Sequence, residues 1–280
     1  MKLTNRTYGV EIEFLEKTGN ASAERSLIAQ ALRNAGLEAY SEDYNHTTRS
    51  YWKLIYDSSA GHELVSPVLS GEDGFRQIEV ACKVLNDMGY TVDKSCGLHV
   101  HHGANDLSAK EITSVFAIAM KWETVIDLLV APSRRNNTYC ESNNREGTTV
   151  DGTKAALKRL RTAGAERYGR NSHTRYLKVN YEAYLKHGTI EFRQHQGTLD
   201  AAKIISWIVM TQNFITKAVE QGASYTVSQT GVCFKRFRDM LGCNGSALED
   251  NAYVKMAAKT MLERWTKFSG GRNSYSPTIS

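Results

Sequence analysis

The sequence has few of the residues that interrupt or cross-link a protein chain. Only 3 of its 280 residues are proline, and no Pro-rich, Gly-rich or low-complexity linker divides it. We therefore predict a single domain over residues 1–280. The 5 cysteines form no CxxC pair and are odd in number, which disfavours both a disulfide framework and a cysteine-based zinc site. This pattern fits a reducing compartment, and we predict a cytoplasmic protein.

The chain also lacks a long apolar run and a strong excess of charge. A membrane span needs about 18 consecutive apolar residues, and neither such a run nor an apolar signal core at the N-terminus is present, so we predict no membrane partner. The net charge of +5 and the pI near 8.8 fit an anionic substrate such as a nucleotide. They are modest for binding a phosphate backbone, and basic residues concentrate only over residues 154–170, so we expect no nucleic-acid partner.

What the sequence does contain is a segment in which charged and apolar side chains alternate. Residues 189–200 read TIEFRQHQGTLD, and alternation on a strand would place Glu191, Arg193 and His195 on one face. The His-Gly pair just before this segment predicts a hairpin turn, with residues 176–184 as the preceding strand. The charged face would line either solvent or a cleft.

Two earlier segments repeat the pattern. YGVEIEF carries Glu11 and Glu13 on one face, and GLHVHHG carries His99 and His101. In each segment the other face is apolar and suits a core. Three strands with a charged face indicate one shared site.

Helical spacing of apolar residues alternates along the chain with short strand-like runs. A capping box opens the third helix, at Ser108 and Glu111. The mixture, with strands in adjacent short runs, favours an α+β fold with a curved, largely antiparallel sheet. One face of that sheet would be concave and charged, and helices would cover the other. The expected helices are 22–35, 70–88, 108–131, 200–218, 233–241 and 250–268, and further expected strands are 38–44, 51–57 and 62–68.

Three segments are expected to serve other roles. Residues 133–152 are polar and rich in Asn and Arg, and they are too long for an idle connection; loops of this kind are often substrate lids. A short basic helix is expected near residues 153–163. The tail over residues 269–280 is expected to be loose.

The polar faces carry the donors that hard divalent cations accept. Oxygen-rich sets with an imidazole favour magnesium or manganese over zinc. Taken singly, an ExE pair is more often a solvated face, and an HxH pair is equally compatible with a structural role. Together the segments are harder to explain without a cation, because burying several carboxylates alone is costly. The candidate ligands are Glu11, Glu13, Glu63, His99 and Glu191.

Several other polar residues have two readings each. The planar fork of Arg193 suits a phosphate oxygen, and the alternative is a salt bridge to a neighbouring carboxylate. Arg134 and Arg135, on the polar loop, would contact phosphate or form a solvated surface pair. His195 would be a ligand, a partner of a ligand or a core histidine.

The segments, in this order, resemble the amidoligase family, a branch of the carboxylate-amine ligase superfamily that includes glutamine synthetase and glutamate-cysteine ligase. The similarity spans about two thirds of the chain. The matching pieces are GVEIEF (9–14), HELVSPVLSG (62–71), CGLHVHHG (96–103), RYLKVN (175–180) and TIEFRQHQGTLD.

This resemblance implies a fold like the glutamine synthetase catalytic domain and a phosphoryl-transfer reaction. ATP would phosphorylate a carboxylate in the presence of Mg²⁺ or Mn²⁺, and an amine would attack the acyl phosphate to form an amide or isopeptide bond. The chain is much smaller than glutamine synthetase and lacks its separate N-terminal domain, so neither ring assembly nor glutamate as substrate is inherited. We assign Arg193, Arg135 and Arg175 as catalytic, His101, Arg134 and Asn180 as nucleotide-binding, and Glu11, Glu13, Glu63, His99 and Glu191 as metal ligands.

Two other functions fit the same residues. A two-metal hydrolase acting on a phosphoester or an amide would need similar ligands. A non-enzymatic protein that binds metal or nucleotide is the second alternative. For the ligase, the partners would be a small-molecule or peptide carboxylate and an amine; the sequence names neither, and it leaves the oligomeric state open.

Overall fold

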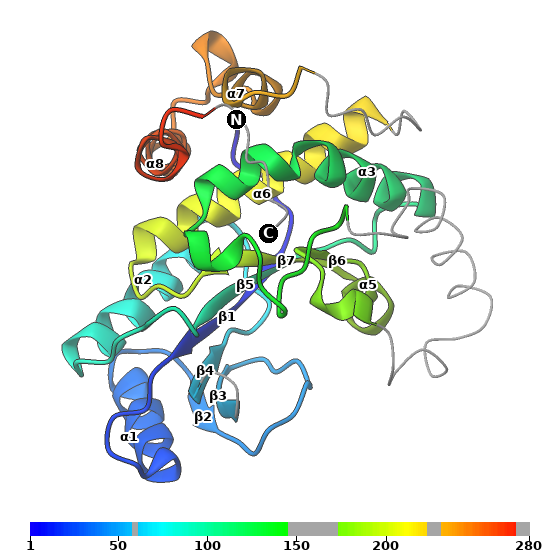
Figure 1. The fold of residues 1–280 in the computed structure, drawn as a ribbon. Helices are drawn as coiled ribbons and strands as arrows, with labels where there is room; N and C mark the ends of the chain where they lie inside the picture. The colour runs from blue at the N-terminus through cyan, green and yellow to red at the C-terminus, as the bar shows by residue number, and fades with distance from the viewer. Residues whose placement is uncertain (58–60, 145–172, 223–230, 273–280) are drawn as a thin grey trace.

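The structure, a computed structural model, describes residues 1–57, 61–144, 173–222 and 231–272. At its centre is a seven-stranded sheet with the strand order β2-β3-β4-β1-β5-β7-β6 (Figure 1). β2 and β3 are parallel, and every other neighbouring pair is antiparallel. The strands are β1 (Tyr8–Phe14), β2 (Ala39–Ser41), β3 (Trp52–Asp57), β4 (Gly61–Val65), β5 (Gly97–Gly103), β6 (Val179–Asn180) and β7 (Thr189–Gln196).

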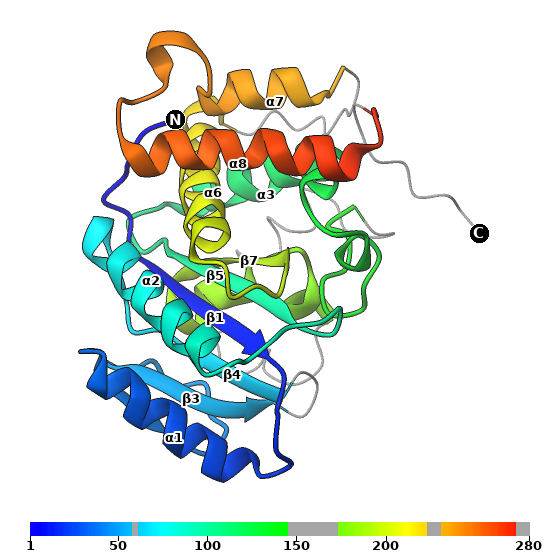
Figure 2. The same ribbon diagram turned by 90° about the vertical axis from the view of Figure 1, so that its left-hand side faces the viewer.

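Helices cover one face of the sheet, in two layers. α1 packs on β2, β3 and β4, and α6 packs on β5, with α2 between α1 and α6 (Figures 1 and 2). α3 and α8 lie on α6, and α7 contacts both α3 and α6. These helices are α1 (Ala21–Asn34), α2 (Gly71–Asp87), α3 (Ala109–Ile126), α6 (Ala201–Gln221), α7 (Phe234–Leu241) and α8 (Ala252–Ser269). The short helix α5 (Glu182–His187) is not part of these layers and packs on β7.

Alternation along the strands gives the sheet an apolar face and a polar face. On β1, Ile12 and Phe14 are fully buried under the helices, while Glu11 and Glu13 point to the other side. Polar side chains on the helix-covered face bond to the helices: His102 bonds to Thr211 of α6 at 2.7 Å, and His62 bonds to Glu24 of α1 at 2.9 Å. The predicted α+β fold with a largely antiparallel sheet is confirmed.

Register places the polar residues of neighbouring strands side by side. Glu11 of β1 lies opposite His99 of β5, and Glu13 lies opposite Glu63 of β4. Opposed side chains on one face of an antiparallel pair are direct neighbours. The charged faces predicted for separate segments are therefore one continuous surface.

The start of α3 follows the predicted capping chemistry, and α6 begins with a second side-chain cap. Ser108 and Glu111 form the reciprocal capping box at the start of α3. Asp200 accepts two backbone N–H groups at the start of α6. Both interactions satisfy donors that a helix N-terminus leaves unpaired. None of the helices in the described ranges is both long and apolar enough to cross a membrane.

The predicted hairpin before residue 189 is wrong. β6 has only two residues, and residues 182–187 form the helix α5 instead of continuing the strand. Gly188 ends α5 with a φ of 65°, a conformation that favours glycine. β6 still pairs with β7 in antiparallel register, because the α5 turn returns the chain beside it.

Other predictions concern residues that lie wholly or partly outside the described ranges. The short basic helix near residues 153–163, the basic stretch over 154–170 and residues 145–152 lie outside the described residues. The predicted start of the loose tail is wrong, since Ser269 is the last residue of α8 and is buried; residues 273–280 lie outside the described part.

Candidate active site

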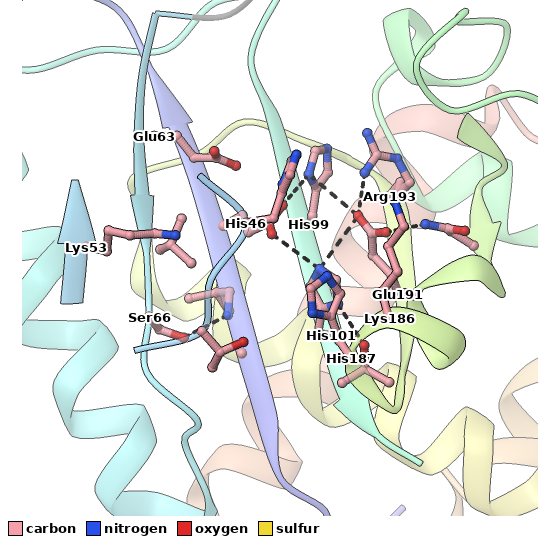
Figure 3. A pocket seen from close by; sticks show the side chains of 18 of the residues that line it. His46, Lys53, Glu63, Ser66, His99, His101, Lys186, His187, Glu191 and Arg193 are labelled. Carbon is pink, nitrogen blue, oxygen red and sulfur yellow. Dashed lines mark hydrogen bonds and ion pairs between the residues drawn. The ribbon is translucent and has the colours of Figure 1, made fainter. Parts of the chain in front are cut away.

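The polar face of the sheet is the floor of a pocket of about 1030 Å³. Side chains from β1, β3, β4, β5 and β7 line it, and residues 44–48 and 175–189 contribute its walls (Figure 3). Pockets that bury a small ligand typically have volumes of about 300–1,000 Å³. This one lies at the upper end of that range.

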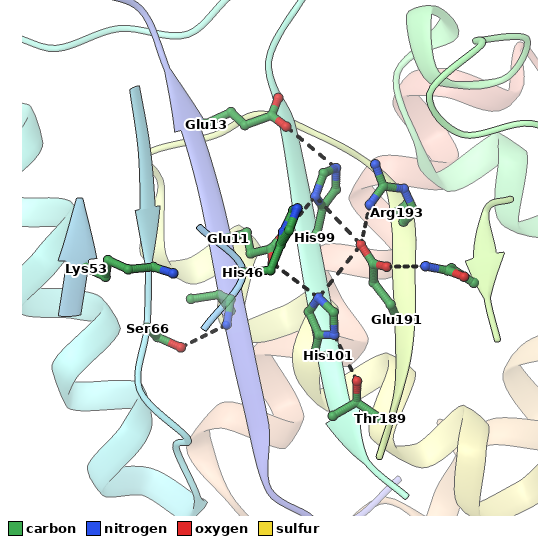
Figure 4. A network of polar contacts seen from close by, with 12 residues as sticks. Glu11, Glu13, His46, Lys53, Ser66, His99, His101, Thr189, Glu191 and Arg193 are labelled. Atoms are coloured by element: carbon green, nitrogen blue, oxygen red, sulfur yellow. Dashed lines mark hydrogen bonds and ion pairs between the residues drawn. The ribbon is translucent and has the colours of Figure 1, made fainter. Parts of the chain in front are cut away.

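Two groups of metal-binding donors lie on the pocket floor. One consists of Glu11, His99 and Glu191, and the other of Glu13, Glu63 and His99; in each group the donor atoms lie within 4.8 Å of one another. These five residues are the predicted ligands, and four separate strands bring them together (Figures 3 and 4).

His99 belongs to both groups because its two ring nitrogens face different carboxylates. Nδ1 lies 2.9 Å from Glu11 Oε2 and 3.8 Å from Glu191 Oε1, and Nε2 lies 3.7 Å from Glu13 Oε1. A neutral imidazole has one lone pair and one N–H. His99 can therefore coordinate a cation in one group while it donates a proton in the other.

The electrostatics of these groups fit the binding of cations. Burial and the neighbouring carboxylates Glu11 and Glu13 raise the pKa of Glu63 well above its ordinary value. A divalent cation between Glu13 and Glu63 would remove this repulsion. The donors are carboxylate oxygens and one imidazole nitrogen, a set that Mg²⁺ or Mn²⁺ accepts.

The second group is already partly neutralised by protein groups. Burial opposes ionisation of Glu11, but the neighbouring imidazoles of His101 and His99 outweigh it and hold its pKa well below the usual range. Burial likewise opposes ionisation of Glu191, and the charges of Arg193 and His101 lower its pKa in spite of it. Both carboxylates are therefore ionised and able to bind a cation.

Arg193 lies where strand alternation predicted, beside Glu191 on the pocket face. Its guanidinium forms an ion pair with Glu191 (Figure 4), and its Nε donates to the carbonyl of Tyr139 at 3.2 Å. The salt-bridge alternative is therefore present in the structure. Because Arg193 also lines the pocket, the ion pair holds its fork at the pocket wall.

His101 lies between Glu11 and Glu191. Its Nε2 is 3.4 Å from Glu11 Oε1 and 3.7 Å from Glu191 Oε1, and its Nδ1 bonds to Thr189 Oγ1 at 2.9 Å. Burial lowers the pKa of His101, but the charge of Glu191 and the hydrogen bond to Glu11 raise it above its ordinary value. The two carboxylates thus favour the protonated form of His101.

Comparison with known proteins identifies the family. The model of a family described as "Putative amidoligase enzyme" matches residues 4–215, a range that includes every residue of both donor groups. The chain belongs to the amidoligase family. The family predicted from the motifs is confirmed, and it is a family of enzymes that form carbon–nitrogen bonds.

Comparisons with curated proteins and with solved structures leave the family assignment of this amidoligase unchanged. No curated protein matches it. Among solved structures it is similar to a chain in the crystal structure of the complex between the prokaryotic ubiquitin-like protein Pup and its ligase PafA, with 10% identity and a TM-score of 0.36. That match covers 99% of this amidoligase but 59% of the other chain, so it spans less than two thirds of that chain's length.

The three other predicted arginines take different positions in the amidoligase. Arg134 is buried, lines the pocket, and donates to the carbonyl of Arg193 at 2.8 Å, so it is not a solvated surface residue. Arg175 is exposed at the pocket wall, with its guanidinium 4.8 Å from the ring centroid of Tyr176. Arg134 and Arg175 are therefore both within the pocket lining.

Arg135 is a correction to the predicted catalytic set. It lies outside the pocket lining and donates to the carbonyls of Asp127 and Phe268, both at 2.8 Å. The short 3₁₀ turn at Pro132–Arg134 sends two consecutive arginines in different directions. Arg135 joins the end of α3 to the end of α8, and its contacts are structural.

His195 is a second correction. A β-bulge shifts the register between Leu98 and Val100, so that His195 lies opposite Leu98 and not on the face of Glu191. His195 is fully buried, and its ring centroid lies 5.0 Å from that of Trp207 on α6. Of the alternatives left open by the sequence, the core histidine is the one observed.

The predicted lid is only partly described, and residues 142–143 of the described part bond to neighbouring elements. Ser142 and the backbone of Asn143 donate to the carboxylate of Glu123 on α3. The side chain of Asn143 also bonds to the backbone of Val179 at both N and O. Residues 142 and 143 are thus attached to α3 and β6, and the closure predicted for residues 133–152 stays a prediction.

Sequence reasoning missed the wall formed by residues 44–48. Lys53, on the pocket face of β3, donates from Nζ to the carbonyls of Asn45 and Thr47 at 2.9 and 3.0 Å. This segment brings His46 over the donor groups (Figure 3). The available signal was a single lysine inside the apolar run WKLIYD, the pattern of a charged residue directed to a polar face.

Proposed function

We propose that this amidoligase is an ATP-dependent and magnesium-dependent carboxylate-amine ligase that forms an amide or isopeptide bond through an acyl phosphate. The observation that supports this most strongly is the pair of donor groups that share His99 beside Arg193 in one pocket. Such a pair suits two cations, which would neutralise the phosphate charge of a nucleotide and orient it.

The residues assigned to the cations are those of the two groups. Glu13 and Glu63 would hold one ion, Glu11 and Glu191 the other, and His99 would coordinate one of the two. His101, which lies against Glu11 and Glu191, is proposed to lie beside the nucleotide. Manganese, with similar preferences for oxygen donors, is expected to replace magnesium.

The proposed reaction has two steps. An oxygen of the substrate carboxylate attacks the γ-phosphorus of ATP, the bond to the bridging oxygen breaks, and ADP leaves. The amine nitrogen then attacks the acyl carbon, loses a proton, and displaces inorganic phosphate as the amide forms. Charge spreads over the oxygens of the transferred phosphoryl group in the first step.

Arg193 is proposed to stabilise that charge. Its fork is held by Glu191 and by the carbonyl of Tyr139, so it needs no reorganisation as charge develops. Arg134 and Arg175 are proposed to contribute positive charge along the same wall. Asn180, predicted to bind nucleotide, uses its amide on Glu191 and on the backbone of Glu182, so we assign it to the support of Glu191.

The substrates are proposed to be a small-molecule or peptide carboxylate and an amine. A pocket of about 1030 Å³ has room for a nucleotide and a part of a second substrate. A cytoplasmic location, where ATP and magnesium are available, remains a prediction from the cysteine pattern.

Product analysis tests this function. Purified protein is incubated with ATP, Mg²⁺ and a pool of metabolites or peptides, and the products are identified by mass spectrometry. The ligase requires ADP and phosphate to form in step with a product whose mass is the sum of two substrates minus water. Release of smaller products without ATP would indicate the two-metal hydrolase instead. Magnesium-dependent melting with no turnover in any pool would favour the non-enzymatic binding protein.

A further inference from the structure

The Glu191 carboxylate is held in place from the edge of the sheet. Asn180 lies opposite Glu191 in the register of β6 and β7 and donates from Nδ2 to Glu191 Oε2 at 2.6 Å. The Oδ1 of Asn180 accepts the N–H of Glu182 at 2.9 Å. The backbone at the start of α5 therefore decides which end of the amide faces the carboxylate. One oxygen of Glu191 is anchored in this way, and the other faces Arg193 and His99.

β6 is too short to hold this arrangement alone. It has two residues and lies at the end of the strand order, where backbone groups lack a neighbouring strand. Asn143 supplies that neighbour with its side chain: Nδ2 donates to the carbonyl of Val179, and Oδ1 accepts the N–H of Val179, both at 2.9 Å. The backbone N–H of Asn143 donates to Glu123 on α3 at 2.7 Å.

A buried lysine fixes the residue before β6. Lys178 has only 1% of its surface exposed, and its Nζ lies 2.8 Å from Asp127 Oδ2 and 3.4 Å from Glu123 Oε1. A buried ammonium that loses its hydrogen-bond acceptors is strongly unfavourable, so these contacts hold Lys178 in place. The carbonyl of Lys178 accepts the N–H of Arg193 at 2.8 Å, so the same residue also joins β6 to the strand that carries Arg193.

These contacts form a chain from α3 to the donor group. We propose that four residues, Glu123, Asp127, Asn143 and Lys178, form a β6 clamp that positions Asn180, and through it the Glu191 carboxylate, for one of the two cations. None of the four residues of the β6 clamp lines the pocket, so they are positioning residues. The inference rests on the proposed function, because it assumes that the donor groups bind cations.

The geometry makes the effect specific to one of the two groups. Glu13 and Glu63 lie on β1 and β4, and the support of Glu13 comes from the N–H of Gly97 on β5. None of these strands pairs with β6. Loosening the β6 clamp should therefore weaken the group containing Glu191 and leave the group containing Glu63 unchanged.

Manganese binding, measured by calorimetry without nucleotide, separates the two groups. Glu63→Gln leaves the group with Glu191 as the intact one, and Glu191→Gln leaves the group with Glu63. Loss of a residue that orients a ligand typically costs about 10–100-fold in metal affinity. We expect Asn143→Ala to weaken Mn²⁺ binding by at least about tenfold in the Glu63→Gln background. In the Glu191→Gln background we expect no change.

The chain contains a matched control for this substitution. Asn213 of α6 is buried like Asn143. Its side chain also makes two hydrogen bonds to the backbone of one residue, accepting the N–H of Lys2 at 2.9 Å and donating to the carbonyl of Lys2 at 2.8 Å. Asn213→Ala should change Mn²⁺ binding in neither background. Asn180→Ala, which removes only the last link and lies on the pocket face, should reproduce the loss caused by Asn143→Ala.

The outcomes distinguish the inference from the proposed function. If the unsubstituted protein binds no Mn²⁺, the cation sites and the proposed function both fail. If it binds two ions and Asn143→Ala or Asn180→Ala behaves like Asn213→Ala, only the β6 clamp is refuted. Equal weakening of both groups would also refute it, because a general loss of structure does not select one site.

Discussion

At the scale of single residues, two adjacent residues of the same type take different roles. Arg134 and Arg135 are adjacent arginines on one polar stretch, yet one lines the pocket and the other binds backbone carbonyls of two helices. Which way each points depends on a 3₁₀ turn and on carbonyls that become available only when the 3₁₀ turn Asp127–Leu129 meets α8. The sequence could therefore propose both arginines but could not choose between them.

The residue whose role is most open to test by substitution is Arg193. Lysine keeps the charge but loses the planar, two-pronged donor geometry, and it can still pair with Glu191. We expect Arg193→Lys to lower turnover by about 100-fold, the scale seen when one preorganised donor is lost. Affinity for ATP and metal should change much less, because the ions chiefly hold the ground-state phosphates. Steady-state turnover and nucleotide affinity, measured on the same folded variant, make the comparison. Full activity would reduce Arg193 to the ion-pair partner of Glu191.

At the scale of elements, the pattern of alternation predicted the site well. YGVEIEF and GLHVHHG became β1 and β5, with their carboxylates and imidazoles on one face. The errors arose where pairing, not local pattern, decides. The bulge that turns His195 into the core depends on the register of β5 and β7, and α5 forms in a six-residue segment too short for its helical period to be read.

The segment between β2 and β3 is an element that only tertiary contacts define. Glu42 binds Arg49 and Tyr51 at its base, and Lys53 binds the backbone carbonyls of Asn45 and Thr47 from the sheet. All three donors of the ammonium can be occupied in this way by the loop, since Asn45 Oδ1 lies 3.1 Å away as well. Lys53 is thus a support of the pocket wall.

Removing that support should loosen the wall without unfolding the sheet. Lys53→Met keeps the aliphatic stem but loses the hydrogen bonds, so residues 43–50 should exchange their amide hydrogens about tenfold faster or more, as expected when about 1.5–3 kcal/mol of charged hydrogen bonding is lost. Hydrogen exchange with mass spectrometry is the measurement. Lys83→Met, which removes an exposed pair with Asp87, is the matched control and should leave the segment unchanged. Unaltered exchange in Lys53→Met would mean that Glu42 alone holds the loop.

At the scale of the whole molecule, the free energy of unfolding should depend on pH through Asp127, a buried acidic residue near β6. Burial raises the pKa of Asp127 from 3.8 to about 7, despite Lys178, and Glu123 adds to the rise while Arg135 opposes it. The folded protein therefore keeps a proton that the unfolded chain loses near pH 4. Its contribution to stability is complete below about pH 4 and is lost as the pH rises through 7.

Asp127→Asn should remove this dependence, because the amide stays neutral at every pH. The free energy of unfolding of the unsubstituted protein should fall, relative to Asp127→Asn, by at most about 1.4 kcal/mol for each pH unit between pH 4 and 7. Urea unfolding at several pH values measures the difference. Parallel pH profiles for the two proteins would show that Asp127 is ionised throughout and that its pairing with Lys178 outweighs its burial.

In the molecule as a whole, one sheet separates an apolar core from a polar pocket. Helices cover one face, and the other collects carboxylates, imidazoles and guanidinium groups in a pocket of about 1030 Å³. The central claim is that this second face binds a nucleotide through divalent cations. Each donor group alone would be a plausible surface cluster, and the claim depends on their joint use.

Calorimetric titration of ATP into the protein, with and without Mg²⁺, tests that claim most directly. We predict that ATP binds at least about tenfold more tightly with Mg²⁺, since the carboxylates repel phosphates unless cations neutralise them. Glu13→Gln should abolish most of this gain, because glutamine keeps the volume but lacks the charge. Equal affinity for ATP in the presence and absence of Mg²⁺, or of Mn²⁺ in its place, would contradict the assignment of Glu11, Glu13, Glu63, His99 and Glu191 as cation ligands.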